Sequence, residues 1–248
     1  MNDEIEFKKY LTRGAYHWEQ ISAHPTRSNA SAKARYQRCV ALLEAGTGSL
    51  VDKQVLDVGC GDGVLSWLLV QRGAVCHGVD PSQIAVEYAR KKHKAKGSRA
   101  QFSVSSGYDT KAAGGFYDAV VSSDVIEHVQ DPNRLLQEIL RVLKPGGTAV
   151  ISTPVRLTED PLDKMHVTEW FHCEFKAIIS NVFPSAHYVY SHPMFWMEFM
   201  DRSKFHRAVI NTLSLLWNPF FATGWRLYAL QYAIVHKKQP TDQDPNDA

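Results

Sequence analysis

A short apolar strand that runs into a glycine-rich turn and then into a helix constrains this chain more than any other feature. The strand is expected at residues 54–58, the turn holds Gly59, Gly61 and Gly63, and the helix that follows ends at Gly73. Glycines at such a turn let the backbone approach a ligand that side chains would block. We therefore expect one strand-turn-helix unit of an α/β fold, with a ligand at its turn.

The same alternation continues along the chain. Apolar runs separated by helical patterns predict four more strands, at residues 74–79, 101–105, 117–122 and 148–152. A helix near 168–181 and two strand candidates, at 186–190 and 228–236, follow. Such alternation predicts a doubly wound parallel sheet with helices on both faces, which binds ligands at the carboxyl ends of its strands.

Length and composition fit one globular domain. The chain has 248 residues, 44% of them hydrophobic, which is enough for a full core. We expect a single domain at 1–238. It begins with an N-terminal helical cap at 1–48, which is followed by a ligand-binding core at 49–153. More variable segments follow at 154–238 and contain an aromatic insertion at about 194–226. The cap reads as a continuous helical pattern from 7 to 44, polar on one side. The tail at 239–248 has no large apolar side chain and is predicted to be disordered.

Charge and cysteine spacing exclude several classes of partner. A formal net charge of +2 supplies no electrostatic reason to bind nucleic acid. The four cysteines lie too far apart for a zinc-binding pair or a disulfide framework, which favours a reducing compartment. The first residues lack the apolar core of a secretory signal, and polar residues interrupt the apolar stretch at 208–225. We therefore expect a cytoplasmic protein without a transmembrane segment.

Two carboxylates near the glycine turn indicate the ligand. A dinucleotide fingerprint would place its third glycine at Val64, so an NAD-dependent oxidoreductase is disfavoured. Asp80 ends the second strand, where a carboxylate accepts hydrogen bonds from both hydroxyls of a ribose. Asp57 suits a ligand with a cationic group near the turn. Adenosine with a charged amino-acid tail fits both carboxylates.

Four ordered motifs carry a family resemblance. Residues 55–63, 78–80, 117–128 and 143–147 resemble the motifs of class I S-adenosylmethionine-dependent methyltransferases. Within that class, the Asp124-x-x-Glu127-His128 string and residues 166–171 are similar to the ubiquinone-biosynthesis O-methyltransferases and their relatives. The resemblance implies a mostly parallel, seven-stranded Rossmann-like sheet with an antiparallel last strand, and S-adenosyl-L-methionine as the methyl donor.

The resemblance also implies roles for individual residues. Gly59 and Gly61 would lie against the methionyl part of the donor, with Asp80 on its ribose and Ser123 in contact with it. Arg35 corresponds to an arginine that some relatives place on the donor carboxylate. Many relatives bind the adenine amine through an acidic residue after the third strand; this chain has serine there, so Ser106 and the neighbouring backbone would replace it. The predicted cofactor-binding set is Arg35, Asp57, Gly59, Gly61, Asp80, Pro81, Ser106, Gly107 and Ser123.

Three polar residues after the fourth strand admit two interpretations. One helical turn would bring Asp124, Glu127 and His128 to one side, a set able to hold Mg²⁺ or Zn²⁺. The same string occurs in relatives not known to need a metal, so a structural or substrate-facing role is the alternative, and the predicted site contains no metal. Methyl transfer needs a positioned acceptor and at most one base, for which we predict His128 and His166. Each histidine has the alternative role of ordering a loop.

The acceptor is the least constrained part of the prediction. Aromatic residues in the cap and in the insertion fit an acceptor pocket, a peripheral membrane contact or plain core: Tyr16, His17, Trp18, Phe195, Trp196, Trp217, Phe220, Phe221 and Trp225. We expect methyl transfer to a small molecule, at a hydroxyl oxygen of an aromatic, lipid-like or secondary-metabolite acceptor. The alternative is a non-catalytic module that binds the donor as a scaffold for a partner.

Overall fold

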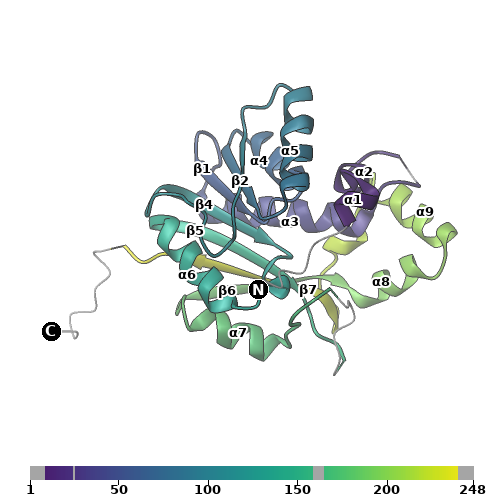
Figure 1. Ribbon diagram of the computed structural model, residues 1–248. Coiled ribbons are helices and arrows are strands. Elements are labelled where there is room, and N and C mark those ends of the chain that lie inside the picture. Colours follow the sequence, from purple (N-terminus) through teal and green to yellow (C-terminus); the bar gives the residue numbers. More distant parts are fainter. Residues whose placement is uncertain (1–8, 25, 159–164, 240–248) are drawn as a thin grey trace.

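The predicted alternation folds into one seven-stranded sheet, drawn in Figure 1. The computed structural model describes residues 9–24, 26–158 and 165–239, so the predicted tail beyond Gln239 lies outside the described residues. The strand order is β3-β2-β1-β4-β5-β7-β6. The strands are β1 (Gln54–Val58), β2 (Val75–Asp80), β3 (Gln101–Val104), β4 (Tyr117–Ser123), β5 (Leu143–Pro154), β6 (Ala186–Pro193) and β7 (Tyr228–His236).

Strand direction confirms the predicted topology. Every pair among β1 to β5 is parallel, whereas β7 runs antiparallel to both of its neighbours, β5 and β6. Because β7 is antiparallel to both, β6 runs in the same direction as β5. The carboxyl ends of six strands therefore share one edge of the sheet, and ligand sites in open α/β sheets form at this edge.

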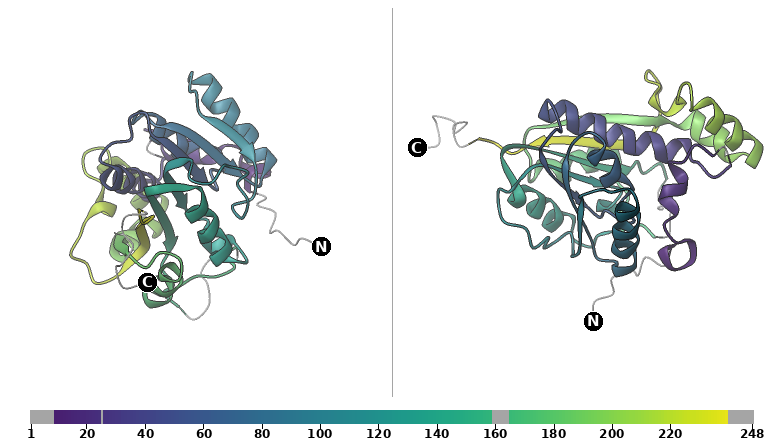
Figure 2. Two further views of the ribbon diagram at one scale, coloured as in Figure 1. Left: turned by 90° about the vertical axis from the view of Figure 1, so that its left-hand side faces the viewer. Right: turned by 90° about the horizontal axis from the view of Figure 1, so that it is seen from above.

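Helices cover both faces of the sheet, as Figure 2 shows. Consecutive residues of β1 point to opposite faces: Val55 packs with Leu43 and Leu65, and Leu56 packs with Ile139 and Phe175. The first face carries α3 (Ala30–Thr47) and α4 (Val64–Val70), the second carries α6 (Pro132–Val142) and α7 (His172–Ser180), and α5 (Gln83–Ala95) packs on β2 and β3. α7 begins later than predicted because Trp170 still bridges to Val155.

The N-terminal cap differs from the prediction. The single helical pattern at 7–44 is three helices, α1 (Lys9–Arg13), α2 (Tyr16–Gln20) and α3. Gly14 separates the first two with a φ of +60°, and the side chain of Asn29 caps α3 by accepting the N–H groups of Ser31 and Ala32. Arg35, which was predicted to contact the donor, lies on α3 with its side chain only 19% exposed.

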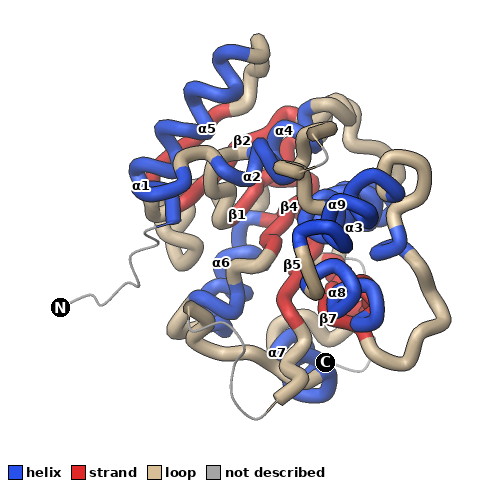
Figure 3. Tube along the Cα trace, turned by 90° about the vertical axis from the view of Figure 1, so that its right-hand side faces the viewer, coloured by secondary structure: helices blue, strands red, loops and turns tan. Residues whose placement is uncertain are grey.

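The insertion lies between β6 and β7, as predicted. It contains α8 (Met194–Asp201), α9 (Lys204–Leu213) and the short helix η2 (Pro219–Phe221). α8 starts directly after β6, so the insertion leaves the sheet at the edge where the carboxyl ends of the parallel strands meet. In Figure 3, α1 and α2 lie on one side of this edge and α8 and α9 on the other. Among the described residues, no helix is long and apolar enough to cross a membrane.

Candidate active site

A cavity of about 990 Å³ lies at the carboxyl ends of β1, β2 and β4, beneath α1 and α2. This volume is at the upper end of the range of roughly 300–1,000 Å³ typical of small-molecule sites, as expected for a site that binds two molecules at once. All the site residues predicted from the sequence line it: Arg35, Asp57, Gly59, Gly61, Asp80, Pro81, Ser106, Gly107, Ser123, His128 and His166.

The glycine turn has no room for side chains. Gly59 and Gly61 have φ values of +73° and +53°, in the left-handed region that favours glycine. A Cβ at Gly59 would lie 2.3 Å from Val125 Cγ2, and a Cβ at Gly61 would lie 2.1 Å from Tyr10 Oη. Tyr10 also lines the cavity and was missed by the sequence analysis, because no local pattern reveals that α1 returns over the turn.

Asp80 holds the glycine turn to the start of α5. Its Oδ2 accepts the N–H of Gly61 at 2.9 Å, and its Oδ1 accepts the N–H of Ser82 at 2.8 Å. Ser82, not Asp80, is the N-cap residue of α5, since its Oγ accepts the N–H of Ala85. Burial raises the pKa of Asp80, although the two N–H bonds oppose this. Each carboxylate oxygen keeps a lone pair with which to accept a ligand hydroxyl.

Asp57 lies under the turn and is 1% exposed. The hydroxyl of Ser66 donates to its Oδ2 at 2.6 Å. Burial raises the pKa of Asp57 to about 7; the Ser66 bond opposes this rise, and the nearby Asp80 charge adds to it. A cationic ligand would favour the ionised form, so this carboxyl can respond to a positive charge placed in the cavity.

Arg35 reaches the cavity from α3 and pairs with Asp124. Its Nη1 donates to Asp124 Oδ2, and its buried Nε has no hydrogen-bond partner among the described residues. Burial disfavours the charge of Arg35, but the Asp124 carboxylate outweighs it and the pKa of Arg35 stays above its usual value. Ser152 Oγ lies 3.2 Å from Asp124 Oδ1 and 3.0 Å from Ser123 Oγ. A ligand carboxylate at Arg35 would therefore share the guanidinium with Asp124.

The loop after β3 forms the wall near Asp80. Ser106 Oγ accepts the N–H of Tyr108 at 3.2 Å, so it is oriented by its own turn. A Cβ at Gly107 would lie only 2.9 Å from Leu135 Cδ1 of α6. The close packing of this loop on α6 therefore requires a glycine at position 107. Pro81 lines the same part of the cavity, between Asp80 and α5.

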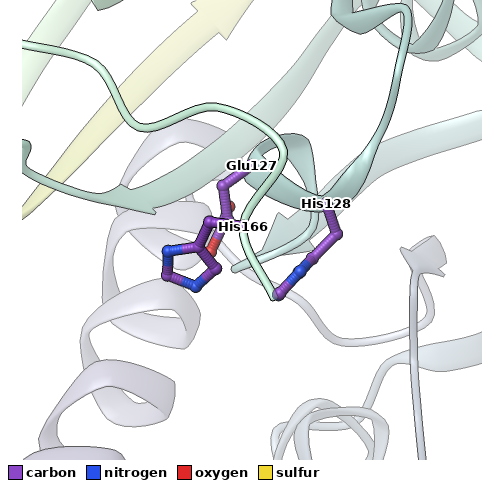
Figure 4. A group of neighbouring side chains, drawn as sticks. All are labelled: Glu127, His128 and His166. Carbon is purple, nitrogen blue, oxygen red and sulfur yellow. The ribbon is translucent and has the colours of Figure 1, made fainter. Parts of the chain in front are cut away.

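His128 and His166, the two predicted bases, lie next to each other in the cavity. The backbone oxygen of Glu127 accepts the N–H groups of Val167 and Thr168, which holds the segment of His166 against η1 (Ile126–His128). The two imidazole rings are 4.9 Å apart and meet edge to face. Figure 4 shows them beside Glu127.

Both histidines are oriented through Nδ1. Nδ1 of His128 lies 3.0 Å from the backbone oxygen of Met165, and Nδ1 of His166 lies 2.5 Å from Glu169 Oε1. Because a carbonyl oxygen only accepts, Nδ1 of His128 carries the proton and Nε2 carries the lone pair when the ring is neutral. Burial lowers the pKa of His128, so its ring is neutral at pH 7.

Of the three residues that helical spacing offered as an alternative metal set, only two come together. Asp124 lies before η1 with a φ of +53°, and its carboxylate accepts a hydrogen bond from Arg35. It is therefore not part of the cluster that contains Glu127 and His128. His166 takes its place: Glu127, His128 and His166 each offer a ligand atom, and these atoms lie within 4.8 Å of one another. Oε1 of Glu127 is buried and has no hydrogen-bond partner among the described residues, while Oε2 accepts from Thr153. Two imidazoles and a carboxylate can hold a divalent cation.

Aromatic residues of the cap line the cavity, whereas those of the insertion do not. Tyr16 and His17 line the cavity, and Trp18 is buried, with its ring nitrogen donating to the backbone oxygen of Asp62 at 2.7 Å. None of the insertion's residues is among those that line the cavity. Phe220 is core, whereas Trp217 is half exposed.

Comparison with known proteins identifies the family and agrees with this fold. The family model of the methyltransferase domain matches residues 30–189. The ubiquinone biosynthesis O-methyltransferase of Bordetella avium is 36% identical over 153 residues, which are 61% of this chain and 61% of that protein. The enzyme of the same name from Vibrio parahaemolyticus is 35% identical over 153 residues, which are 61% of this chain and 63% of that protein. The aligned region thus spans about three fifths of these relatives.

Two solved structures share the fold. Phosphoethanolamine N-methyltransferase 2 of Haemonchus contortus, in complex with phosphomonomethylethanolamine and S-adenosylhomocysteine, superposes with a TM-score of 0.67 at 19% identity and covers 96% of this chain and 60% of that one. The [4+2]-cyclase SpnF superposes with a TM-score of 0.60 at 17% identity, and the match covers 84% of this chain and 83% of that chain. The sheet and its ligand edge define an α/β protein of the Rossmann-like class. Within that class, the chain belongs to the methyltransferase domain family.

Proposed function

We propose that this protein transfers the methyl group of S-adenosyl-L-methionine to a hydroxyl oxygen of a small aromatic or lipid-like acceptor. The observation that carries the proposal is the convergence, in one cavity, of the glycine turn with Asp80 and of the imidazoles of His128 and His166. The first group suits a nucleoside with a charged tail, and the second suits a hydroxyl that must lose a proton.

In this mechanism the chain binds and orients the donor. Asp80 accepts hydrogen bonds from the ribose hydroxyls, Asp57 faces the cationic end of the donor, and Arg35 shares its guanidinium with the donor carboxylate. Ser106 and Gly107 border the adenine, and Ser123 contacts the tail. These contacts hold the donor so that its methyl carbon faces the acceptor.

The chemical step is an in-line displacement. The bond from the methyl carbon to the donor sulfur breaks as a bond forms to the acceptor oxygen, and the hydroxyl proton passes to an imidazole. His128 is neutral at pH 7 and can accept this proton at Nε2, and Glu169 orients His166 beside it. Positioning supplies most of the rate, because the sulfonium is already reactive.

A divalent cation is a second candidate occupant of the same site. The unpartnered buried Oε1 of Glu127 favours it, together with the two imidazoles whose Nδ1 atoms are already bound. Glu127, His128 and His166 would hold the cation, which would polarise the acceptor hydroxyl.

Calorimetric titration with S-adenosylhomocysteine tests the donor site, with NAD as the control ligand. Micromolar binding of S-adenosylhomocysteine alone is expected; binding of NAD alone, or of neither, would overturn the proposal. Repeating the titration in EDTA shows whether a cation supports the donor. A donor-binding protein that turns over no hydroxylated acceptor would support the scaffold alternative instead.

We also propose a reducing compartment, the cytoplasm, as the location. All four cysteines are unpaired thiols, and three of them, Cys39, Cys60 and Cys76, are buried. A net charge of +2 favours a small-molecule acceptor over nucleic acid.

A further inference from the structure

The insertion carries most of the exposed large apolar side chains. Of the fourteen such residues among those described, eight lie between residues 195 and 227. Leu216 is 93% exposed and Phe205 is 73% exposed. Soluble monomers rarely gather such residues in one place, so a large patch marks an interaction surface. We name this patch the apolar face: Phe195, Phe205, Leu215, Leu216, Trp217 and Trp225.

Ring contacts connect three members of the apolar face, Phe195, Trp217 and Trp225, through Trp196. Phe195 stacks on Trp225 with centroids 5.5 Å apart, and it also meets Trp196 at 5.0 Å. Trp196 in turn meets Trp217 at 6.2 Å. The apolar face therefore joins the start of α8 to the loops on both sides of η2.

The opposite side of the insertion is fixed to the body. Met200, Ile210 and Phe220 pack against α3 in one buried cluster. Asn211 Oδ1 accepts the N–H of Ala30 at 2.9 Å, and Asn218 Nδ2 donates to the oxygen of Ala30 at 2.9 Å. The insertion is thus held by its inner side, and the outer apolar face remains exposed on a well-anchored element.

Charge beside the apolar face indicates what covers it. Arg202, Lys204, Arg207 and Arg226 are exposed on the same insertion, and the exposed acidic residues there are Glu198 and Asp201. Arg207 pairs with Asp201 at 2.9 Å, which leaves a positive excess. A second copy docked symmetrically would bring these cations together. Anionic lipid headgroups would complement them, while Trp and Leu side chains enter the interface.

We propose that the apolar face docks on the surface of an anionic lipid bilayer. Trp217, Leu215 and Leu216 enter the boundary of the headgroups, and Arg202, Lys204 and Arg226 contact the phosphates. The cavity lies at the same edge of the sheet from which α8 extends, so the docked protein holds its active-site edge near the bilayer. Figure 1 shows α8 and α9 beyond this edge. The matched family region ends at residue 189, so this surface lies outside the part shared with the family model.

Vesicle flotation of the full chain tests the proposal without any methyl donor, so its result is independent of the proposed catalysis. The probes are vesicles of phosphatidylcholine, alone or mixed with phosphatidylglycerol. We expect binding to the mixed vesicles, and the double variant Leu215→Ser with Leu216→Ser should lower the partition coefficient about tenfold or more. Lys204→Gln should lower it about fivefold at low salt.

Phe116→Ser is the matched control, because Phe116 is 47% exposed and lies just before β4, away from the insertion. It should bind vesicles as the wild type does. Circular dichroism and thermal unfolding of the leucine variant check that it folds. Flotation that fails for the wild type, or that persists unchanged in the folded leucine variant, would overturn the proposal. So would a dimer in light scattering that the leucine variant abolishes while vesicles stay unbound.

Discussion

The hydroxyl of Tyr10 lies directly over Gly61, so close that a Cβ at this glycine would sit 2.1 Å from Tyr10 Oη. The two residues belong to different parts of the chain, α1 and the turn after β1. Their contact fixes how closely the N-terminal cap covers the cavity. Gly61 is therefore needed both for its φ of +53° and for the space that Tyr10 occupies.

Gly61→Ala is expected to destabilise the fold and to weaken binding of S-adenosylhomocysteine. The left-handed φ alone costs an alanine about 1–2 kcal/mol, and the clash with Tyr10 adds to this. Urea unfolding measures the first effect, and calorimetry the second. Tyr10→Phe removes the clashing hydroxyl, so the double variant should recover part of the lost stability. Strict additivity of the two changes would contradict the contact.

Asp80→Ala should weaken binding of S-adenosylhomocysteine by about 1–3 kcal/mol, because the ribose loses charge-assisted hydrogen bonds. The variant also frees the N–H groups of Gly61 and Ser82, which the carboxylate holds at 2.9 and 2.8 Å. Ser82→Ala is the control: it removes the N-cap of α5 and leaves the carboxylate in place. Donor affinity equal to that of the wild type in the folded Asp80 variant would refute the assignment of the ribose site.

The sequence predicted local elements well because their signals are local. The Asp131-Pro132 start of α6 is an N-cap followed by proline, and the Asp131 side chain accepts the N–H of Arg134 as that pattern requires. The seven strands follow from apolar runs bounded by turns. The spacing of the motifs was also sufficient to predict which residues line one cavity.

Contacts between distant segments were not predictable in this way. Tyr10 reaches Gly61 only because α1 folds back over the sheet edge, and Arg35 meets Asp124 across 89 positions of sequence. The alternative metal set of Asp124, Glu127 and His128 differs from the observed cluster for the same reason. Helical spacing suggested Asp124, but a positive φ and a long-range ion pair turn this residue away, and His166 arrives from a later loop.

Asp57 should make stability depend on pH. Its pKa rises from 3.8 in the unfolded chain to about 7 in the folded one, so the folded state holds the extra proton between these values. The free energy of unfolding therefore falls as pH rises towards 7, by on the order of 4 kcal/mol for this group, and is constant above. Urea unfolding from pH 4 to 8 should give Asp57→Asn a flatter profile than the wild type. Parallel profiles would contradict the shift.

The same carboxyl should control donor affinity. A cationic donor favours ionised Asp57, so binding of S-adenosylmethionine is expected to strengthen as pH rises through about 7 and then to level off. Asp57→Asn should remove this dependence. Calorimetry at several pH values measures it, and an unchanged pH profile in the variant would show that another group responds to the donor.

Glu169→Gln should lower kcat and leave donor affinity unchanged. Glu169 is 3% exposed and accepts from Nδ1 of His166 at 2.5 Å, so it holds the ring in one orientation. Loss of the carboxylate should leave the imidazole poorly oriented, which lowers kcat while the KM for the donor stays unchanged. Glu174→Gln is the control, since Glu174 only caps α7. A kcat equal to that of the wild type in the folded Glu169 variant would contradict this positioning role.

Glu127→Gln tests whether the site binds a cation, and Asp124→Asn separates the two candidate metal sets. Zn²⁺ should bind the wild type through Glu127, His128 and His166, whose ligand atoms lie within 4.8 Å of one another. Burial and the nearby Asp124 charge raise the pKa of Glu127 well above its usual value, so the cation must displace a proton, and affinity should increase with pH. Calorimetry should find Zn²⁺ affinity at least about tenfold weaker in Glu127→Gln. Asp124→Asn removes the charged partner of Arg35 but no ligand of this set, so its Zn²⁺ affinity should fall far less than that of Glu127→Gln. A comparable loss of Zn²⁺ affinity in both variants would restore the set that helical spacing suggested, and equal binding by all three proteins would place the cation elsewhere.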